Sequence, residues 1–231
     1  MTPAFDTVAV PRTVYRIGRP PDVWAWPPWS AIRTGASGNR WDDPLGRYRV
    51  LYTSHTRLGA LLETLAPLQP DPALPTVYEA ITENDPDDPA TIPPGILTPR
   101  WRDRRVVGEG VTDGVSEPLV AVAGPGSLAR IEPLARDMGI ADLDAEAMRL
   151  TRRRAFTQQV SRVVFLGRQP VTRRAYAGIF SLSFYDADIR NYALFERRGR
   201  SDPVSHLSRE RIDVADADFV EACRRRGLTP A

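Results

Sequence analysis

Hydrophobic and polar positions follow two different periods along this chain, and together they predict an α+β domain. Short alternating or β-branched runs predict strands over residues 14–17, 47–54, 105–111, 118–123, 176–183 and 192–196. Apolar residues spaced three and four apart predict helices over residues 56–66, 127–138, 145–165 and 216–226. Strands and helices do not alternate one by one, so a parallel βαβ architecture is not expected.

The length of the chain and the order of these elements predict how it is divided. At 231 residues it is expected to form one compact domain. Residues 1–12 are predicted to be a flexible N-terminal arm, and residues 13–200 the main domain. Residues 201–231 are predicted to be a C-terminal strand and helix that pack on the same domain. The proline-rich residues 84–99 are expected to form a surface excursion.

The basic residues of the chain are all arginine, and acidic residues nearly balance them. The formal net charge of +2 gives no global case for nucleic-acid binding. Arginines cluster at residues 152–154, 197–198 and 224–226, which are interpreted as solvated faces or, alternatively, as RNA or partner contacts. One cysteine and two histidines predict neither a disulfide nor a metal site, and no apolar stretch reaches the ~18 residues of a membrane span. A cytoplasmic protein is therefore expected.

Three charged residues are candidates for chemistry. Glu63 lies among leucines on the predicted helix 56–66, so its carboxylate is either partly buried or an exposed helix charge. Arg16 lies on a predicted strand, from which it either enters a cleft or stays on the surface. Arg40 lies in a Gly/Asn-rich loop, where it either approaches a ligand or forms a salt bridge to Asp42 or Asp43.

Two further candidates end predicted strands. Tyr52 either stacks on a flat ring of a ligand or belongs to the core. Ser183 either hydrogen-bonds a ligand carboxamide or carboxylate, or bonds the backbone. It is not expected to be a nucleophile, because no histidine or lysine accompanies it.

Through these residues and their order along the chain, the sequence resembles the RES-domain family, whose members are toxins of bacterial toxin–antitoxin pairs. The matching segments are Tyr15-Arg16, Gly38–Pro44, Tyr48–Tyr52, Ala60–Leu65, Thr157–Arg162, Gly178–Ser183 and Tyr192–Glu196. The resemblance implies a single compact α+β domain like the ADP-ribosyltransferases. Its split, mixed or antiparallel sheet would be flanked by helices, and residues 13–200 would be the RES-like NAD-binding domain.

The resemblance also implies an activity and a site. The implied activity is that of an NAD-consuming toxin, which cleaves the nicotinamide–ribose bond by hydrolysis or phosphorolysis. The alternatives are a mono-ADP-ribosyltransferase acting on a cellular protein, and a catalytically inactive partner- or RNA-binding module. Glu63, Arg16 and Ser183 would be catalytic, and Arg40 and Tyr52 would bind the substrate.

The resemblance implies NAD as a substrate, with no cofactor and no metal. It implies a helix-turn-helix antitoxin as partner, no membrane and no direct nucleic acid, and homodimerisation stays open. Three residues depart from the family pattern: Ile17 where some members carry a tyrosine, Ser181 where an aromatic residue is usual, and Phe184 where an arginine is frequent. The last departure predicts that phosphate contacts from this edge of the cleft are lost.

Overall fold

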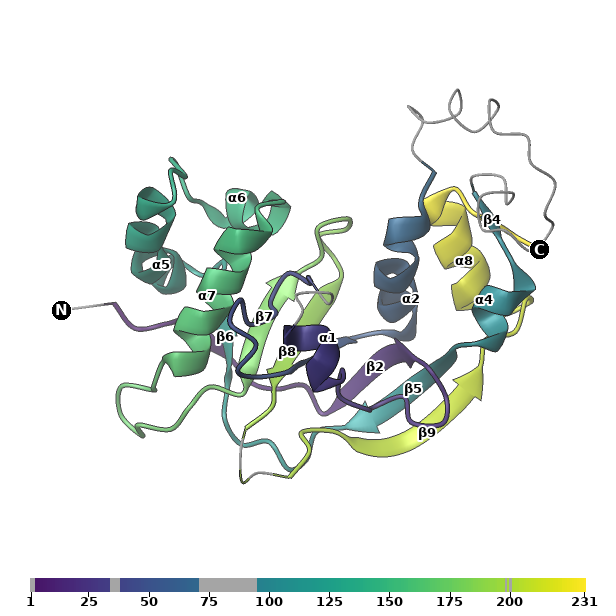
Figure 1. The fold of residues 1–231 in the computed structure, drawn as a ribbon, viewed down its shortest axis with the longest axis horizontal. Coiled ribbons are helices and arrows are strands. Elements are labelled where there is room, and N and C mark those ends of the chain that lie inside the picture. The colour runs from purple at the N-terminus through teal and green to yellow at the C-terminus, as the bar shows by residue number, and fades with distance from the viewer. Residues whose placement is uncertain (1–2, 34–37, 71–94, 198, 200) are drawn as a thin grey trace.

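The computed structural model describes residues 3–33, 38–70, 95–197, 199 and 201–231. Its centre is an eight-stranded sheet with the strand order β1-β6-β7-β8-β3-β2-β5-β9 (Figure 1). The strands are β1 (Thr7–Val8), β2 (Thr13–Gly18), β3 (Val50–Ser54), β5 (Val106–Val111), β6 (Leu119–Ala121), β7 (Gly178–Leu182), β8 (Arg190–Phe195) and β9 (Ser205–Arg211). Only β6 and β7 run parallel in this sheet, so the predicted mixed, mostly antiparallel α+β fold is confirmed.

The helices other than α1 form two groups against the sheet, α5, α6 and α7 in one and α2, α4 and α8 in the other (Figure 1). The helices are α1 (Trp29–Arg33), α2 (Arg57–Leu65), α4 (Pro99–Asp103), α5 (Pro125–Asp137), α6 (Ala145–Leu150), α7 (Arg154–Leu166) and α8 (Ala217–Arg226), with a 3₁₀ turn η1 (Ala66–Leu68). One core cluster joins α5, α6 and α7 to β7 and β8, and another joins α2 and α8 to β2 and β5. A short parallel pair of β4 (Ile96–Leu97) and β10 (Thr229–Pro230) lies beside the second group.

The sheet is split between β2 and β3. These two strands are joined at a single residue pair, Tyr15 with Ser54. By contrast, β2 pairs with β5 from Thr13 to Gly18, and β3 pairs with β8 over its whole length. The residues that follow Tyr15 on β2 therefore stay paired with β5 on one side but have no paired strand on the side of β3, where the sheet opens.

Helix α2 forms for reasons that the sequence already contains. The hydroxyl of Thr56 accepts a hydrogen bond from the N–H of Gly59 at 3.0 Å, which caps the first turn. Leu61, Leu62 and Leu65 are buried against the sheet and α8. The predicted helix is confirmed, and its packing fixes the rotation that places Glu63 at the edge of the apolar stripe.

The predicted helix 145–165 is instead two helices. Helix α6 ends at Leu150 because Thr151 adopts an extended conformation with ψ of 127°. Helix α7 starts only at Arg154. Arg152 and Arg153 lie within this break, and Arg154 is the first residue of α7.

One other expectation, the flexible arm at residues 1–12, differs from the structure. Within the predicted flexible arm, Phe5 is buried, and the carboxylate of Asp6 accepts hydrogen bonds from the first turn of α5. Thr7–Val8 then pairs with β6. The strand expected within residues 201–231 is β9, whose bounds the sequence did not give because an exposed edge strand carries no apolar alternation. Most of the predicted excursion at 84–99 lies outside the described residues.

None of the helices described here is long and apolar enough to span a membrane.

Candidate active site

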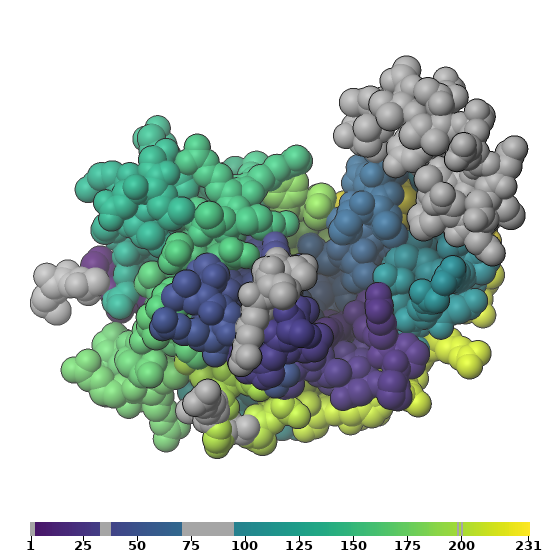
Figure 2. Space-filling model, viewed as in Figure 1, coloured from purple at the N-terminus to yellow at the C-terminus, as the bar shows by residue number. Residues whose placement is uncertain are grey.

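A cleft of about 600 Å³ opens where the sheet is split. In Figure 2 the surface is hollowed between the green region of α6 and α7 and the blue region of α2. The lining includes all five site residues that the sequence predicted: Arg16, Arg40, Tyr52, Glu63 and Ser183. It also includes three polar residues that the sequence did not assign to a site: Arg152, Arg154 and Asn191. The volume lies in the range of pockets that bury a small organic ligand.

Glu63 is held by a residue of the opposite wall. The Nδ2 of Asn191 on β8 donates a hydrogen bond to Oε1 of Glu63 at 2.8 Å. The Oδ1 of Asn191 is buried and has no hydrogen-bond partner in the described structure. This pair fixes one carboxylate oxygen and leaves an unused acceptor beside it. The only sequence signal for Asn191 was a polar side chain on the same strand face as the buried Ala193.

Arg16 enters the cleft from the open edge of β2. Its Nη1 donates to the carbonyl oxygen of Ala25 at 3.3 Å, in the loop that follows β2. Burial lowers the pKa of Arg16 to about 10, and the charge of Asp22 opposes this effect. The guanidinium is therefore still charged at neutral pH.

Arg40 also lines the cleft and comes from the loop before β3. Its Nη2 donates to the carbonyl of Met148, and its guanidinium lies 4.7 Å from the ring centre of Trp41. Its Nε is buried and has no hydrogen-bond partner among the residues that the structure describes. Burial first, then the charge of Arg154, lowers the pKa of Arg40 to about 10, while Glu63 opposes the shift. The predicted alternative of a salt bridge to a neighbouring aspartate is not what the structure has.

Those aspartates have other partners. Asp42 accepts hydrogen bonds from the N–H of Asn39 at 2.8 Å and from the hydroxyl of Tyr52 at 2.9 Å. Asp43 accepts from the N–H of Arg47 and lies 3.7 Å from Arg162. The two carboxylates therefore fold the loop and leave Arg40 to face the cleft.

Tyr52 connects this loop to the sheet. Its hydroxyl donates to Asp42 and accepts from the N–H of Trp41 at 2.9 Å. Burial, followed by the charge and hydrogen bond of Asp42, raises the pKa of Tyr52 well above its ordinary value. The hydroxyl is thus fully engaged, and what Tyr52 offers to a ligand is its ring.

Ser183 lies where β7 turns into the loop that forms a rim of the cleft. The side chain is 1% exposed, and its Oγ accepts a hydrogen bond from the N–H of Tyr185 at 3.0 Å. Ser183 therefore shapes the rim, and its hydroxyl proton is the group that remains to contact a ligand.

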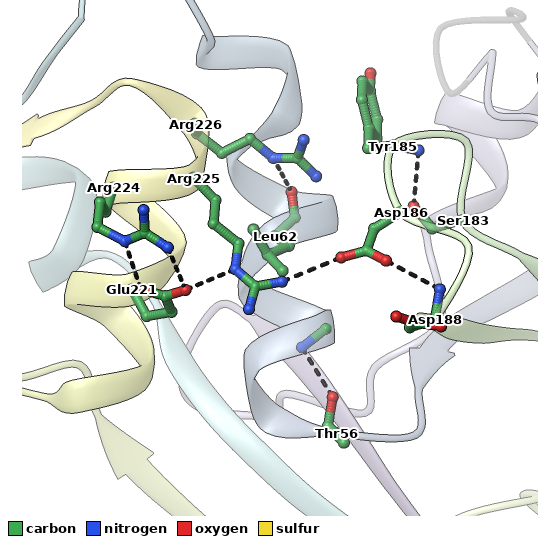
Figure 3. Close-up of polar contacts among 11 residues, drawn as sticks. Thr56, Leu62, Ser183, Tyr185, Asp186, Asp188, Glu221, Arg224, Arg225 and Arg226 are labelled. Atoms are coloured by element: carbon green, nitrogen blue, oxygen red, sulfur yellow. Dashed lines mark hydrogen bonds and ion pairs between the residues drawn. The ribbon is translucent and has the colours of Figure 1, made fainter.

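The rim is fastened to α8 on the far side of α2, as Figure 3 shows. Arg225 forms an ion pair with Asp186 at 3.1 Å. The buried Arg226 donates from Nε to the carbonyl of Leu62 at 3.1 Å, and its guanidinium lies 4.3 Å from the ring centre of Tyr185. The C-terminal helix thereby fixes α2 and the rim to each other.

The charges in the lining are unevenly matched. Four arginines face the cleft, and Glu63 is the only carboxylate among the described residues that line it. None of the four forms an ion pair with a described carboxylate: Arg16, Arg40, Arg152 and Arg154. Such a cleft suits an anionic ligand, and guanidinium groups match phosphate best. Within the described part of the chain no group of three or more His, Cys, Asp or Glu residues is arranged for a metal ion.

The family model of the RES domain matches residues 13–131, just over half of the chain. The chain therefore belongs to the RES-domain family, which confirms the resemblance drawn from its sequence. The matched region contains Arg16, Arg40, Tyr52 and Glu63, whereas Ser183 and Asn191 lie beyond it.

A solved structure has the same fold. It is a chain of the crystal structure of the M. tuberculosis MbcT–MbcA toxin–antitoxin complex, with a TM-score of 0.55 and 11% sequence identity. The similarity covers 96% of this chain and 92% of that chain. No curated protein matches the sequence. At this identity the structural likeness supports the fold, and the activity has to be argued from the site.

Proposed function

We propose that this protein consumes NAD by breaking the bond between nicotinamide and ribose. The observation that carries the proposal is one carboxylate, that of Glu63, oriented by Asn191 in a cleft with four arginines that form no ion pair with any carboxylate among the described residues. NAD has the complementary features. It carries two phosphates for the guanidinium groups, and its reacting carbon becomes positively charged as nicotinamide leaves.

Each residue then has a defined task. The C1′–N1 bond breaks, its electron pair goes to nicotinamide, and the cation that develops on the ribose is stabilised by Glu63. Arg16 and Arg40 hold the phosphates, so that binding energy from the distant part of the ligand fixes the ribose against Glu63. Tyr52 supplies a ring face, and the Ser183 hydroxyl orients the substrate. Water or inorganic phosphate attacks C1′, and its proton is released to solvent.

The same proposal assigns a biological role. Membership in the RES-domain family and the fold shared with a chain of a toxin–antitoxin complex support a toxin that is restrained by an antitoxin. A helix-turn-helix antitoxin that covers the cleft is the proposed partner. Expression of the chain alone is expected to arrest growth and deplete cellular NAD, and co-expression of the antitoxin to restore both.

The direct test measures NAD and products over time with purified protein. Removing a carboxylate that stabilises a transition state costs about a hundred- to thousandfold in rate, so Glu63→Gln is expected to lose NAD consumption while it unfolds at the same temperature. Glu210→Gln is the matched control, because Glu210 lies in a separate cavity beside β9. Undiminished NAD consumption by Glu63→Gln would contradict the proposal.

Product analysis separates the reactions. Free ADP-ribose indicates hydrolysis, and a phosphorylated ADP-ribose that requires added phosphate indicates phosphorolysis. A discrete labelled protein after incubation of a lysate with labelled NAD would instead indicate ADP-ribosyl transfer.

A further inference from the structure

The arginines of this chain differ in what they face. Outside the cleft, several are paired with carboxylates, as Arg49 is with Glu196 and Arg57 with Asp216. Arg152 and Arg154 line the cleft without such a partner in the described structure. Arg153, which lies between them, points away and donates to the carbonyls of Met138 and Gly139 at 3.4 Å. The break between α6 and α7 therefore directs two of three adjacent arginines into the cleft.

Arg152 rests on a platform. Its guanidinium lies 4.9 Å from the ring centre of Phe184, which also lines the cleft. The backbone of this platform is fixed to α6, because Nη1 of Arg149 donates to the carbonyls of Ser183 and Phe184 at 3.1 Å each. Phe184 stands where an arginine is frequent in the family, and phosphate contacts from this edge of the cleft were therefore expected to be lost. In the structure, Arg152 of the α6–α7 connection brings a guanidinium to the same edge.

Arg154 lines the same cleft as Arg40. Burial first, then the charge of Arg154, lowers the pKa of Arg40. The buried Nε of Arg40 has no hydrogen-bond partner within the described structure. An anion bound between these side chains would remove the repulsion and accept the unused hydrogen bond.

We propose that Arg152 and Arg154 bind the diphosphate of a nucleoside diphosphate ligand, and that Phe184 is the platform that orients Arg152. The inference rests on the proposed function only in taking the ligand to carry a nicotinamide beyond its diphosphate. The phosphate contacts themselves are those of ADP, which this cleft would bind without any reaction.

Calorimetric titration of the full chain with ADP, ADP-ribose and adenosine tests the proposal. A charged hydrogen bond contributes enough for about tenfold in affinity, so Arg152→Gln and Arg154→Gln are each expected to weaken ADP binding about tenfold. Arg153→Gln is the matched control and should bind ADP as the wild type does. Adenosine, which lacks phosphates, should bind all three variants alike.

The platform has its own test. Phe184→Leu keeps an apolar side chain but removes the ring face, so ADP affinity is expected to fall about threefold. In the Arg152→Gln background the same change should have no further effect. A threefold loss that persists without Arg152 would overturn the role of Phe184 as a platform.

The outcomes separate this inference from the proposed function. Arg152- and Arg154-dependent ADP binding by a protein that never consumes NAD would support the inference and defeat the proposed function. NAD consumption with equal ADP affinities in Arg152→Gln, Arg154→Gln and Arg153→Gln would overturn the inference alone. Unchanged ADP binding, together with equal loss of single-stranded RNA binding in all three variants, would overturn it and assign the arginines to RNA.

Discussion

Replacing Asn191 by alanine is expected to separate activity from stability. The amide makes one hydrogen bond to Glu63 at 2.8 Å, and its buried Oδ1 has no partner in the described part of the chain. The Glu63 carboxylate is partly exposed, so losing the hydrogen bond that orients it is expected to raise the activation free energy by about 1.5 kcal/mol. This corresponds to about a tenfold fall in kcat. KM should change little, because Asn191 acts through Glu63 and not on the phosphates.

The free energy of unfolding should respond differently. The variant loses about 1.5 kcal/mol of hydrogen bonding but also removes a buried unsatisfied oxygen, which costs the wild type about 1–3 kcal/mol. The two effects nearly cancel, so Tm should stay within about 3 °C of the wild-type value. A residue that only stabilised the fold would show the opposite pattern, with a large fall in Tm.

The assay is a double-mutant cycle with NAD consumption and thermal unfolding measured for each protein. In the Glu63→Gln background, Asn191→Ala should cost less than about twofold, because the carboxylate that it orients is gone. Asn39→Ala is the control, since Asn39 lines the cleft but its hydrogen bonds to Asp42 and Gln158 use its backbone. A full tenfold loss in the Glu63→Gln background would refute the argument, as would wild-type activity of Asn191→Ala alone.

Three further predictions concern the framework around the cleft. Tyr52→Phe removes the donor to the buried Asp42 and should lower the free energy of urea unfolding by about 2 kcal/mol, whereas unchanged stability would show that the Tyr52–Asp42 contact is dispensable. Gly178→Ala would place a Cβ 2.0 Å from the Ala193 carbonyl oxygen and should cost at least about 2 kcal/mol, against no cost for Gly114→Ala, whose Cβ would meet nothing within 4 Å. Burial works to raise the pKa of Asp216, but hydrogen bonds from Arg57 and the Phe219 N–H hold that pKa below its ordinary value. A lowered folded-state pKa adds stability above the unfolded pKa of about 3.9, and this stability is lost as the pH falls through the folded value. Asp216→Asn, which keeps a side-chain cap for α8, should therefore be less stable than wild type at pH 7 and match it near pH 2; a difference in unfolding free energy that stays constant over this range would contradict the assignment.

Much of the fold was predictable because it depends on local patterns. The apolar spacing of Leu61, Leu62 and Leu65, with Thr56 before them, was sufficient to predict α2 and its first turn. Alternation likewise predicted β3, β5, β7 and β8. A strand was expected within residues 201–231, but its bounds were not predictable. The side chains of β9 are mostly exposed, and its pairing with β5 through backbone groups leaves no mark on the side-chain pattern.

The candidate site also has features that the sequence predicted and features that only the fold decided. The sequence by itself determined the types of residue and their order, since Arg16, Arg40, Tyr52, Glu63 and Ser183 could all be named from motifs. Only the tertiary structure decided that the split between β2 and β3 gathers them around one cleft. It also decided that Asn191 orients Glu63, and that the break at Thr151 directs Arg152 and Arg154 into the cleft while Arg153 turns away. These choices depend on contacts between segments more than a hundred residues apart, such as Glu63 with Asn191 and Arg40 with Met148, and no local pattern encodes such contacts.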